Sequence, residues 1–454
     1  MFSHMTDMDS FETRREYGQS RRKQLPRQSH GRWDPKQRQH SALSLLEQSM
    51  RGRVPSLVTL KYERMAASPF GFFRGAVPIM AADLAQLPDT GILTQLCGDA
   101  HVRNLGAYAG PDGRLVFDIN DFDETIRGPF EWDIKRLATS LVLAGREAGN
   151  KNHDCSDAVS AFIRTYCKAV RGFANMPVID LARYQVHRLQ RIAPVSQALL
   201  KAERSTALHT LETLTEPAKP KRNESPHRIF KEQKPLLTRV RPSQARAVLA
   251  SLKLYEESLQ PDRRHFVHQY RPRDVAFKVV GTGSVGTRDY CVYFEGNGSG
   301  DPLFLQIKEE LPSAYEPYLK ETGVARHQGR RVAEGQRAMQ FQSDIFLGWT
   351  TLADRDYVVR QLNDHKASIA VEDLKGQALV EYAEICGELL ARGHSRAGEP
   401  QVLSGYLGNG RSFEKAIMEF AEAYADQTER DREELLKSKH APRATAKAKA
   451  TAEK

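Results

Sequence analysis

The chain has 454 residues, of which 40% are hydrophobic and 27% are charged, a balance typical of globular proteins with room for more than one core. It contains no run of about 18 apolar residues that would predict a membrane span. Its five cysteines are scattered without a CxxC pair, which argues against a disulfide framework and against a cysteine zinc site. We therefore expect a cytoplasmic protein with reduced thiols and no membrane contact.

The net charge of +10 is concentrated at the two ends of the chain. Residues 1–53 carry a net charge of +5 and residues 437–454 carry another +5, so the segment between them is formally neutral. A nucleic-acid-binding domain usually carries its basic surplus on its own folded surface. The distribution therefore argues against nucleic acid as a partner, except through the two basic tails.

The first strongly patterned segment, residues 68–75, has the sequence SPFGFFRG. Two interpretations are open: Arg74 faces a substrate, or the segment is a loop packed by its three phenylalanines. Packing is the favoured interpretation, because large aromatic side chains usually dominate the core of a protein.

Two acidic stretches follow, CGDAHVRN at residues 97–104 and LVFDINDFDE at residues 115–124. Asp99 precedes Asn104 by five positions, and Asp121 comes 17 residues after Asn104. Phosphoryl transfer from MgATP needs a carboxylate to accept the proton of the attacking hydroxyl, and an amide and a second carboxylate to hold magnesium. The spacing predicts Asp99 as the catalytic base and Asn104 and Asp121 as metal ligands.

The second stretch also places four carboxylates within seven residues, from Asp118 to Glu124, among apolar neighbours. Like charges this close are costly unless a cation offsets their repulsion. Metal binding is therefore favoured over a solvated acidic turn. His101 is either a further ligand or a hydrogen-bonding residue within its loop. Pro-Asp-Gly at residues 111–113 predicts a turn that joins the two stretches in a β-hairpin.

Downstream, the segment KVVGTGSVGTR contains a GxGxxG pattern at Gly281, Gly283 and Gly286, with Ser284 inside it. A dinucleotide-binding loop must open a helix, but residues 289–294 are aromatic and β-branched and predict a strand. A glycine-rich turn and a second strand, at residues 303–309, come next. Glycine loop, strand, turn and strand form the pattern with which a kinase covers ATP phosphates.

Lys308 lies near the end of that second strand, where a lysine would contact the α- and β-phosphates of ATP. A glutamate from the next helix usually holds this lysine. Residues 328–339 have helical character, so Glu334 is chosen over Glu316, whose following proline disfavours a helical conformation. Residues 357–362 predict a strand that leads into the hinge.

The GDAHVRN motif of residues 98–104 resembles the HGDxHxxN catalytic loop of aminoglycoside and choline phosphotransferases, with Cys97 in place of the usual histidine. The DFD of residues 121–123 resembles their metal-binding segment, and Asp133 resembles their helix-start aspartate. More closely, eight ordered motifs over residues 15–435 resemble the bacterial DUF2252 family. They are SPFGFFRG, CGDAHVRN, NDFDET, GPFEWDIKRLATS, VGTGSVGTR, LQIKEE, VRQLNDHK and YADQ.

The resemblance implies an α+β, bilobal protein-kinase-like fold, with a small antiparallel β-sheet N-lobe and a larger, mainly helical C-lobe. Because the catalytic loop precedes the glycine loop, the fold would be circularly permuted. The expected segments are a basic, loosely ordered start (1–40), the first part of the catalytic lobe (41–215), a linker with connecting helices (216–270), the nucleotide-binding lobe (271–366), a helical second part of the catalytic lobe (367–435) and a disordered Lys/Ala-rich tail (436–454).

The expected activity is transfer of phosphate from ATP, with Mg²⁺, to a hydroxyl of a small molecule or protein. Gly281, Gly283, Ser284, Gly286, Lys308 and Glu334 would bind the nucleotide. The alternatives are a pseudokinase that binds ATP without turnover, an AMP transferase on the same scaffold, and a metal-dependent hydrolase. The hydrolase would use Asp99, His101, Asp118 and Asp121, but it leaves Lys308 unexplained. The sequence carries no signature of the acceptor or of the oligomeric state.

Overall fold

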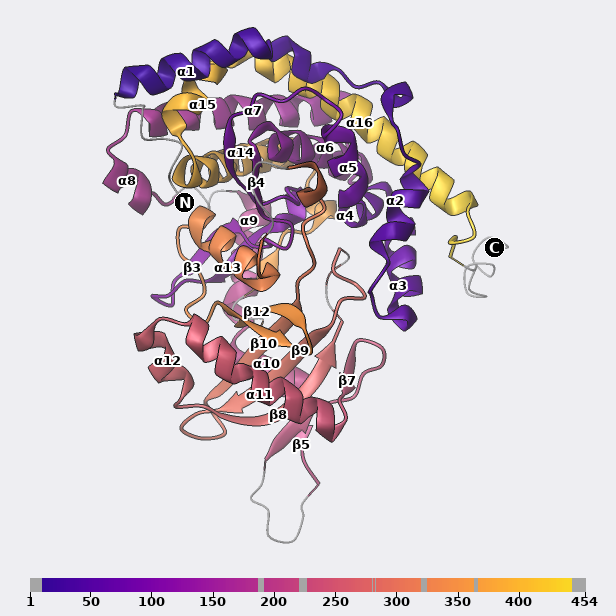
Figure 1. Ribbon diagram of the computed structural model, residues 1–454, viewed down its shortest axis with the longest axis vertical. Coiled ribbons are helices and arrows are strands. Elements are labelled where there is room, and N and C mark those ends of the chain that lie inside the picture. Colours follow the sequence, from indigo (N-terminus) through magenta and orange to yellow (C-terminus); the bar gives the residue numbers. More distant parts are fainter. Residues whose placement is uncertain are drawn as a thin grey trace.

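A computed structural model describes residues 10–186, 192–219, 227–279, 281, 283–319, 325–362 and 366–442. The fold is a mixed α+β arrangement with small antiparallel sheets and a larger helical region, which agrees with the expected class. The largest sheet lies at one end of the molecule, and most of the long helices gather at the other end (Figure 1). We call these two parts the sheet region and the helical region.

The sheet region is built on a six-stranded sheet with the order β11-β12-β10-β9-β8-β7, in which every neighbouring pair is antiparallel. Its central strands alternate aromatic and β-branched residues that pack on both faces. The strands are β7 (Leu237–Arg239), β8 (Arg271–Lys278), β9 (Asp289–Glu295), β10 (Pro302–Glu309), β11 (Gly348–Leu352) and β12 (Arg355–Gln361).

Different elements cover the two faces of this sheet. Helices α11 (Pro242–Ser258) and α12 (Pro261–Val267) pack their apolar side chains on one face. Helix α10 (Ala207–Leu214) and the short pair β5 (Thr215–Pro217) and β6 (Arg228–Phe230) cover the other face. The expected linker of residues 216–270 therefore contributes strand β7 and both helices of one face to the sheet region.

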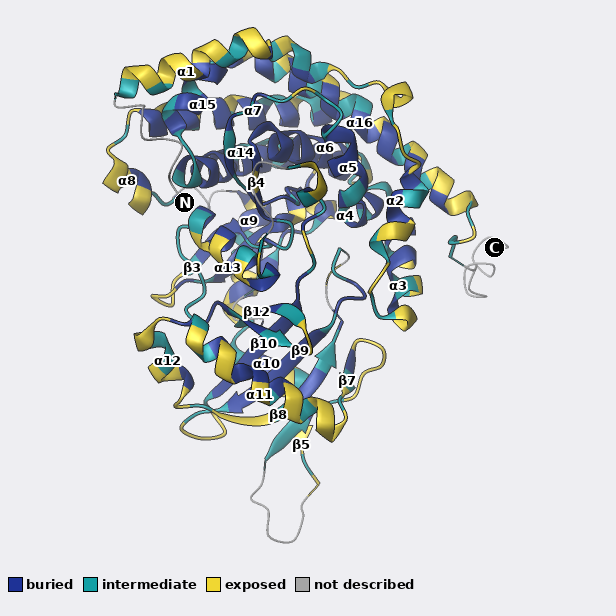
Figure 2. Cartoon of the chain, viewed as in Figure 1, coloured by how far each residue is buried: buried dark blue, intermediate teal, exposed yellow. Residues whose placement is uncertain are grey.

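The helical region has one large core. Helix α7 lies along α14, α16 packs on α6 and α7, and α1 crosses α15. Figure 2 shows that α6 is buried along nearly its whole length, whereas the outer side of α1 is exposed. The bounds are α1 (Phe11–Gln24), α6 (Glu131–Glu147), α7 (Asn152–Ala174), α14 (Gln377–Ala397), α15 (Pro400–Leu407) and α16 (Arg411–Lys437).

The amino-terminal segment departs from the expectation of loose order. Ser10 caps α1 by accepting the N–H of Thr13, and Gly18 lies so close to the backbone of Val402 that a Cβ would collide with it. Because α1 docks on α15, its polar residues form a helix that its composition did not predict. Most of the Lys/Ala-rich tail, residues 443–454, lies outside the described residues.

Shorter elements complete the fold. They are α2 (Ala42–Ser49), α3 (Pro55–Ala66), α4 (Pro69–Gly75), α5 (Val77–Leu84), α8 (Val178–Arg183), α9 (Ala193–Arg204) and α13 (Gln328–Met339), with strands β1 (Leu93–Leu96), β2 (Leu105–Ala109), β3 (Leu115–Ile119), β4 (Ile126–Pro129) and β13 (Ala367–Ser368). The hairpin expected around residues 111–113 is confirmed, because β2 and β3 pair on either side of that turn. The strands expected at 289–294, 303–309 and 357–362 and the helix at 328–339 are confirmed as well.

Candidate functional site

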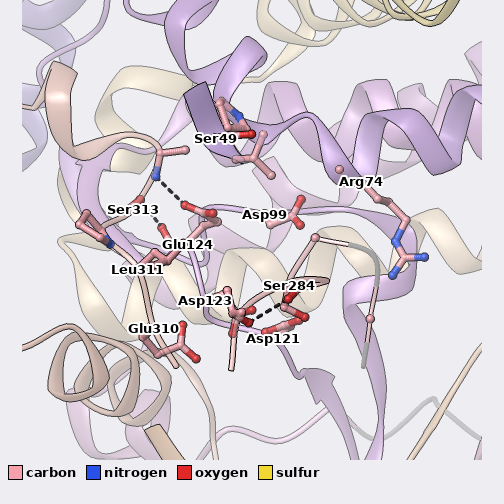
Figure 3. Close-up of a pocket in the computed structure, with 18 of the residues that line it drawn as sticks. Ser49, Arg74, Asp99, Asp121, Asp123, Glu124, Ser284, Glu310, Leu311 and Ser313 are labelled. Carbon is pink, nitrogen blue, oxygen red and sulfur yellow. Dashed lines mark hydrogen bonds between the residues drawn. The ribbon is translucent and has the colours of Figure 1, made fainter. Parts of the chain in front are cut away.

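A cavity of about 410 Å³ lies where the sheet region meets the helical region. Both acidic stretches and the glycine loop line it, although the second acidic stretch ends at Glu124 and the glycine pattern begins only at Gly281. Figure 3 shows the carboxylates of this cavity gathered near Ser284. Of the residues predicted to form the site, the following six line the cavity: Asp99, Asn104, Asp121, Gly281, Gly283 and Ser284.

One face of helix α6 holds the first acidic loop in place. Asp133 accepts the backbone N–H groups of Cys97, at 2.8 Å, and Gly98, at 3.0 Å. One and two turns further along α6, Arg136 donates to Asp99 and Ser140 accepts the N–H of Val102, at 3.1 Å. Positions i, i+3 and i+7 lie on one face of a helix, so a single rigid element fixes the whole loop.

The cysteine at position 97 does not disturb this geometry. It is buried, and it contributes to the loop through its backbone N–H. Gly98 has φ +83°, and a Cβ there would collide with the carbonyl group of Glu124, so only glycine fits. The imidazole of His394 lies 3.2 Å from Asp133 and belongs to the same buried support.

Asp99 is bound on one oxygen and open on the other. The Oδ1 atom accepts from Nε of Arg136 at 2.8 Å and lies 2.6 Å from Nη2, and the Arg136 side chain is fully buried. The Oδ2 atom accepts no hydrogen bond from the described residues, and Nε2 of His101 lies 3.6 Å from it. Burial lowers the pKa of His101 to about 3, despite the opposing charge of Asp99, so this imidazole is neutral.

Asn104 joins the two acidic loops through its side-chain amide. Its Nδ2 donates to the carbonyl oxygens of Asp99 and Asp121, both at 2.9 Å, and its Oδ1 accepts the backbone N–H of Asp121 at 2.7 Å. The amide oxygen keeps one lone pair for another partner. In the structure the amide therefore positions both loops, and its role as a metal ligand stays a prediction.

Asp121 and Asp123 lie side by side against Lys308, which forms an ion pair with Asp123. Burial and the neighbouring Asp121 raise the pKa of Asp123 to about 6. Burial opposes ionisation of Asp121 as well, but the charges of Lys308 and Arg360 outweigh it and lower the pKa of Asp121. The Oδ1 atoms of both aspartates are buried without a hydrogen-bond partner among the described residues.

Two unsatisfied carboxylate oxygens at a cavity fit a magnesium ion, which prefers oxygen ligands. Among the described residues, no three His, Cys, Asp or Glu side chains are grouped to hold a metal by themselves. Magnesium in ATP-dependent enzymes is usually bound by one or two carboxylates together with substrate phosphates. Asp121 and Asp123 match this smaller requirement.

Glu334 is not where the sequence analysis expected it. Its carboxylate is half-exposed on α13 and pairs with Arg330, at 2.8 Å. Lys308 is instead surrounded by carboxylates from other elements, Asp123 beside it and Glu310 at 3.9 Å. Helical position alone could not reveal which face of α13 turns toward the sheet. Arg331 of α13 does face the site and donates to the carbonyl oxygen of Asp123, at 2.8 Å.

The glycine loop is held from outside by the segment that contains α3. Gly281 and Gly286 have φ of +64° and +93°, which favour glycine. The Val54 N–H and the Arg53 guanidinium donate to the carbonyl oxygens of Gly286 and Val285, both at 2.7 Å. Lys308 and Gly286 support the cavity wall from behind and do not belong to its lining.

A family model described as "Uncharacterized protein conserved in bacteria (DUF2252)" matches residues 53–438. The chain belongs to the DUF2252 family. No curated protein and no solved structure matches it. The matched region includes every residue of the DUF2252 cavity described above except the part of α2 that borders it. Among the described residues of this DUF2252 protein, no helix is long and apolar enough to cross a membrane.

The sequence analysis missed several residues of this DUF2252 site. Arg136 and Ser140 could have been found, because they share a helical face with Asp133. Arg53 and Lys61 line the cavity from α3 and the turn before it, and nothing in their local sequence points to the glycine loop.

All five cysteines are buried and unpaired, as expected.

Asp118, a ligand in the hydrolase alternative, has a structural role instead. Its carboxylate forms an ion pair with Arg392 of α14, and both side chains are buried. It also accepts the backbone N–H of Ile119, at 2.8 Å. The carboxylate is thus already neutralised by a protein cation and does not belong to the cavity lining.

This ion pair predicts a large loss of stability in Arg392→Met. Removing one partner of a buried pair leaves an uncompensated charge, so we expect the free energy of unfolding in urea to fall by about 3–5 kcal/mol. The control is Arg411→Met, at an exposed position at the start of α16. A loss as small as that of the control would mean that solvent reaches Asp118.

Asp289 of β9 predicts a pH-dependent contribution to stability. Burial raises the pKa of this carboxyl from the usual 3.8 to about 7, although Lys308 and a hydrogen bond from Gln306, at 2.7 Å, oppose the shift. Asp289 releases its proton near pH 4 in the unfolded chain and near pH 7 in the folded protein. The free energy of unfolding that this group contributes therefore falls as the pH rises from about 4 to about 7. Asp289→Asn removes this dependence. In urea unfolding, the free energy of unfolding of Asp289→Asn relative to that of wild type should increase between pH 5 and pH 8. If this difference between variant and wild type does not change with pH, the raised pKa of Asp289 is contradicted.

Proposed function

We propose that this DUF2252 protein is an ATP- and magnesium-dependent phosphotransferase that acts on a hydroxyl group. The observation that carries the proposal is the meeting of four features in or directly behind the lining of one cavity. They are the glycine loop with Ser284, Lys308 in an ion pair with Asp123, the orphaned oxygens of Asp121 and Asp123, and the open Oδ2 of Asp99. A metal-dependent hydrolase would have no use for the first two.

Each group has a defined task in the transfer. The glycine-loop backbone covers the phosphates, and Lys308 contributes positive charge to them. Asp121 and Asp123 would hold magnesium, which neutralises the charge on the phosphates when it is bound. Because Lys308 is paired with Asp123 in the structure, it must exchange this carboxylate for phosphate oxygens when the nucleotide binds.

The chemical step uses Asp99. The acceptor oxygen forms a bond to the γ-phosphorus, the bond from that phosphorus to the bridging oxygen breaks, and ADP leaves. The hydroxyl proton passes to Oδ2 of Asp99, the oxygen left open by Arg136. Arg136 orients the Asp99 carboxylate, and Asn104 fixes the distance between the base and the Asp121 loop.

The proposal includes a circularly permuted protein-kinase-like fold. Its support is the order of elements: β8, glycine loop, β9, turn, β10 with Lys308, helix α13, then β11 and β12. This is the order of a kinase nucleotide-binding lobe, whereas the loop of Asp99 comes earlier in the chain. A cytoplasmic location, expected from the unpaired cysteines, belongs to the same proposal.

The test is incubation of the purified full-length protein with MgATP. A thermal shift with MgADP should report binding, and mass spectrometry should detect ADP together with a phosphorylated product. If neither ATP nor ADP stabilises the protein in the presence of magnesium, the proposal fails.

The same experiment separates two alternatives. Stabilisation by MgATP without any product would indicate a pseudokinase that only binds nucleotide. Release of pyrophosphate with an AMP-modified product would indicate AMP transfer. The intact set of Asp99, Asp121 and Lys308 favours turnover, because a degraded kinase site usually lacks one of its base, metal ligand and lysine.

A further inference from the structure

The cavity has a cationic wall whose members have no carboxylate partners. Arg53, Lys61, Arg74 and Arg103 all line it. Among the described residues, none of the four forms an ion pair. They come from the turn before α3, from α3, from α4 and from the Asp99 loop, so four separate stretches direct positive charge to one space.

Three carboxylates of the same cavity are compensated by cations outside its lining. Asp99 pairs with Arg136, and Asp123 pairs with Lys308. Glu309 pairs with Arg288 at 3.0 Å and with Arg355 at 2.6 Å. These three carboxylates therefore have cation partners outside the cavity, whereas Glu124 of the lining acts on Arg53 and Lys61 only through its nearby charge, without a direct ion pair among the described residues.

Lys61 makes this imbalance costly. It is 2% exposed, and its only hydrogen-bond acceptor among the described residues is the carbonyl oxygen of Gly283. Burial lowers the pKa of Lys61, the nearby charge of Arg53 lowers it further, and the charges of Glu124, Asp99 and Asp123 oppose the shift. A buried ammonium group without a direct ion pair is costly, so the folded protein is expected to gain stability when an anion binds beside it.

Arg74 is the member closest to the proposed base. Its Nε lies 3.4 Å from Nε2 of His101, which is 3.6 Å from Oδ2 of Asp99. Its two Nη groups donate no hydrogen bond to the described residues. Phe72 and Phe73 anchor α4 in the core, so the expected aromatic packing is present and also directs Arg74 into the cavity. Figure 3 shows Arg74 on the opposite side of the cavity from Glu310.

We propose that Arg74, with Arg103 beside it and Lys61 behind, binds an anionic group of the hydroxyl substrate, so that the acceptor is a phosphorylated or carboxylated alcohol. A guanidinium binds both groups through two parallel hydrogen bonds. This rests on the proposed function, because the acceptor hydroxyl must lie next to Asp99. The nucleotide phosphates have separate partners in the glycine loop, in Lys308 and in the magnesium ion that Asp121 and Asp123 would hold.

The test uses inorganic phosphate as the probe and the full-length protein saturated with MgADP. Calorimetric titration should detect phosphate binding to wild type, weakened by about tenfold or more in Arg74→Gln and in Arg103→Gln. The Kd for MgADP should change by less than about twofold in both variants. Arg204→Gln, at an exposed position, is the matched control, and Arg74→Lys should recover part of the phosphate affinity. Melting temperatures establish that the variants are folded.

Three outcomes would overturn the inference. If no phosphate binding is detected, the cavity has no anion site. Phosphate that competes with MgADP would assign the cations to the nucleotide instead of the acceptor. Phosphate binding that is equal in wild type and both variants would place the anion elsewhere. A failure of MgADP to bind would count against the proposed phosphotransferase, whereas the phosphate titration without nucleotide would still decide whether the cationic wall binds anions.

Discussion

Replacing Asp99 by asparagine is expected to slow MgATP turnover, measured as ADP release, by about 10²- to 10⁴-fold, the usual contribution of a general base. The Kd for MgADP should stay within about twofold of the wild-type value, because no nucleotide-binding group is removed. The effect follows from the geometry, in which Oδ2 is the oxygen left open to accept a proton.

The control for this variant must account for Arg136, which loses its carboxylate partner when Asp99 becomes asparagine. A melting temperature measured alongside turnover separates unfolding from lost chemistry, and Asp157→Asn, at an exposed position on α7, controls for the loss of charge alone. If Asp99→Asn is folded and turns over ATP at the wild-type rate, another group is the base.

Replacing Lys308 by methionine is expected to weaken MgADP binding by about tenfold or more and to abolish measurable turnover. The variant should also be less stable without ligands, by about 3–5 kcal/mol, because Asp121, Asp123 and Glu310 would lose the cation between them. Magnesium alone should then raise the melting temperature of Lys308→Met more than that of wild type.

The matched control is Lys253→Met, on the exposed side of α11. Magnesium stabilisation that is the same in Lys308→Met and wild type would contradict the assignment of Asp121 and Asp123 as a cation site. Calcium should discriminate less than magnesium between Lys308→Met and wild type in the stabilisation it gives, because calcium accepts larger and more irregular shells of oxygen ligands.

The order of strands, turns and glycines was readable from the sequence because local chemistry decides it. Residues 289–294 and 303–309 are apolar, β-branched and aromatic runs around a glycine-rich turn, and they form β9 and β10. Asp99 and Asn104 were predicted from their spacing within one loop, and Asp121 from its spacing after the hairpin of β2 and β3, which places it opposite Asn104. Local spacing also predicted α13.

The partners of these residues were decided by the tertiary structure alone. Whether Lys308 pairs with Glu334 or Asp123 depends on the rotation of α13 against the sheet, and a helical pattern does not specify which polar face turns inward. Likewise, α1 is a helix because it docks on α15, and Lys61 reaches the glycine loop because α3 packs beside it. Contacts between distant segments depend on the packing of the whole core, whereas a sequence pattern reports only its own neighbourhood.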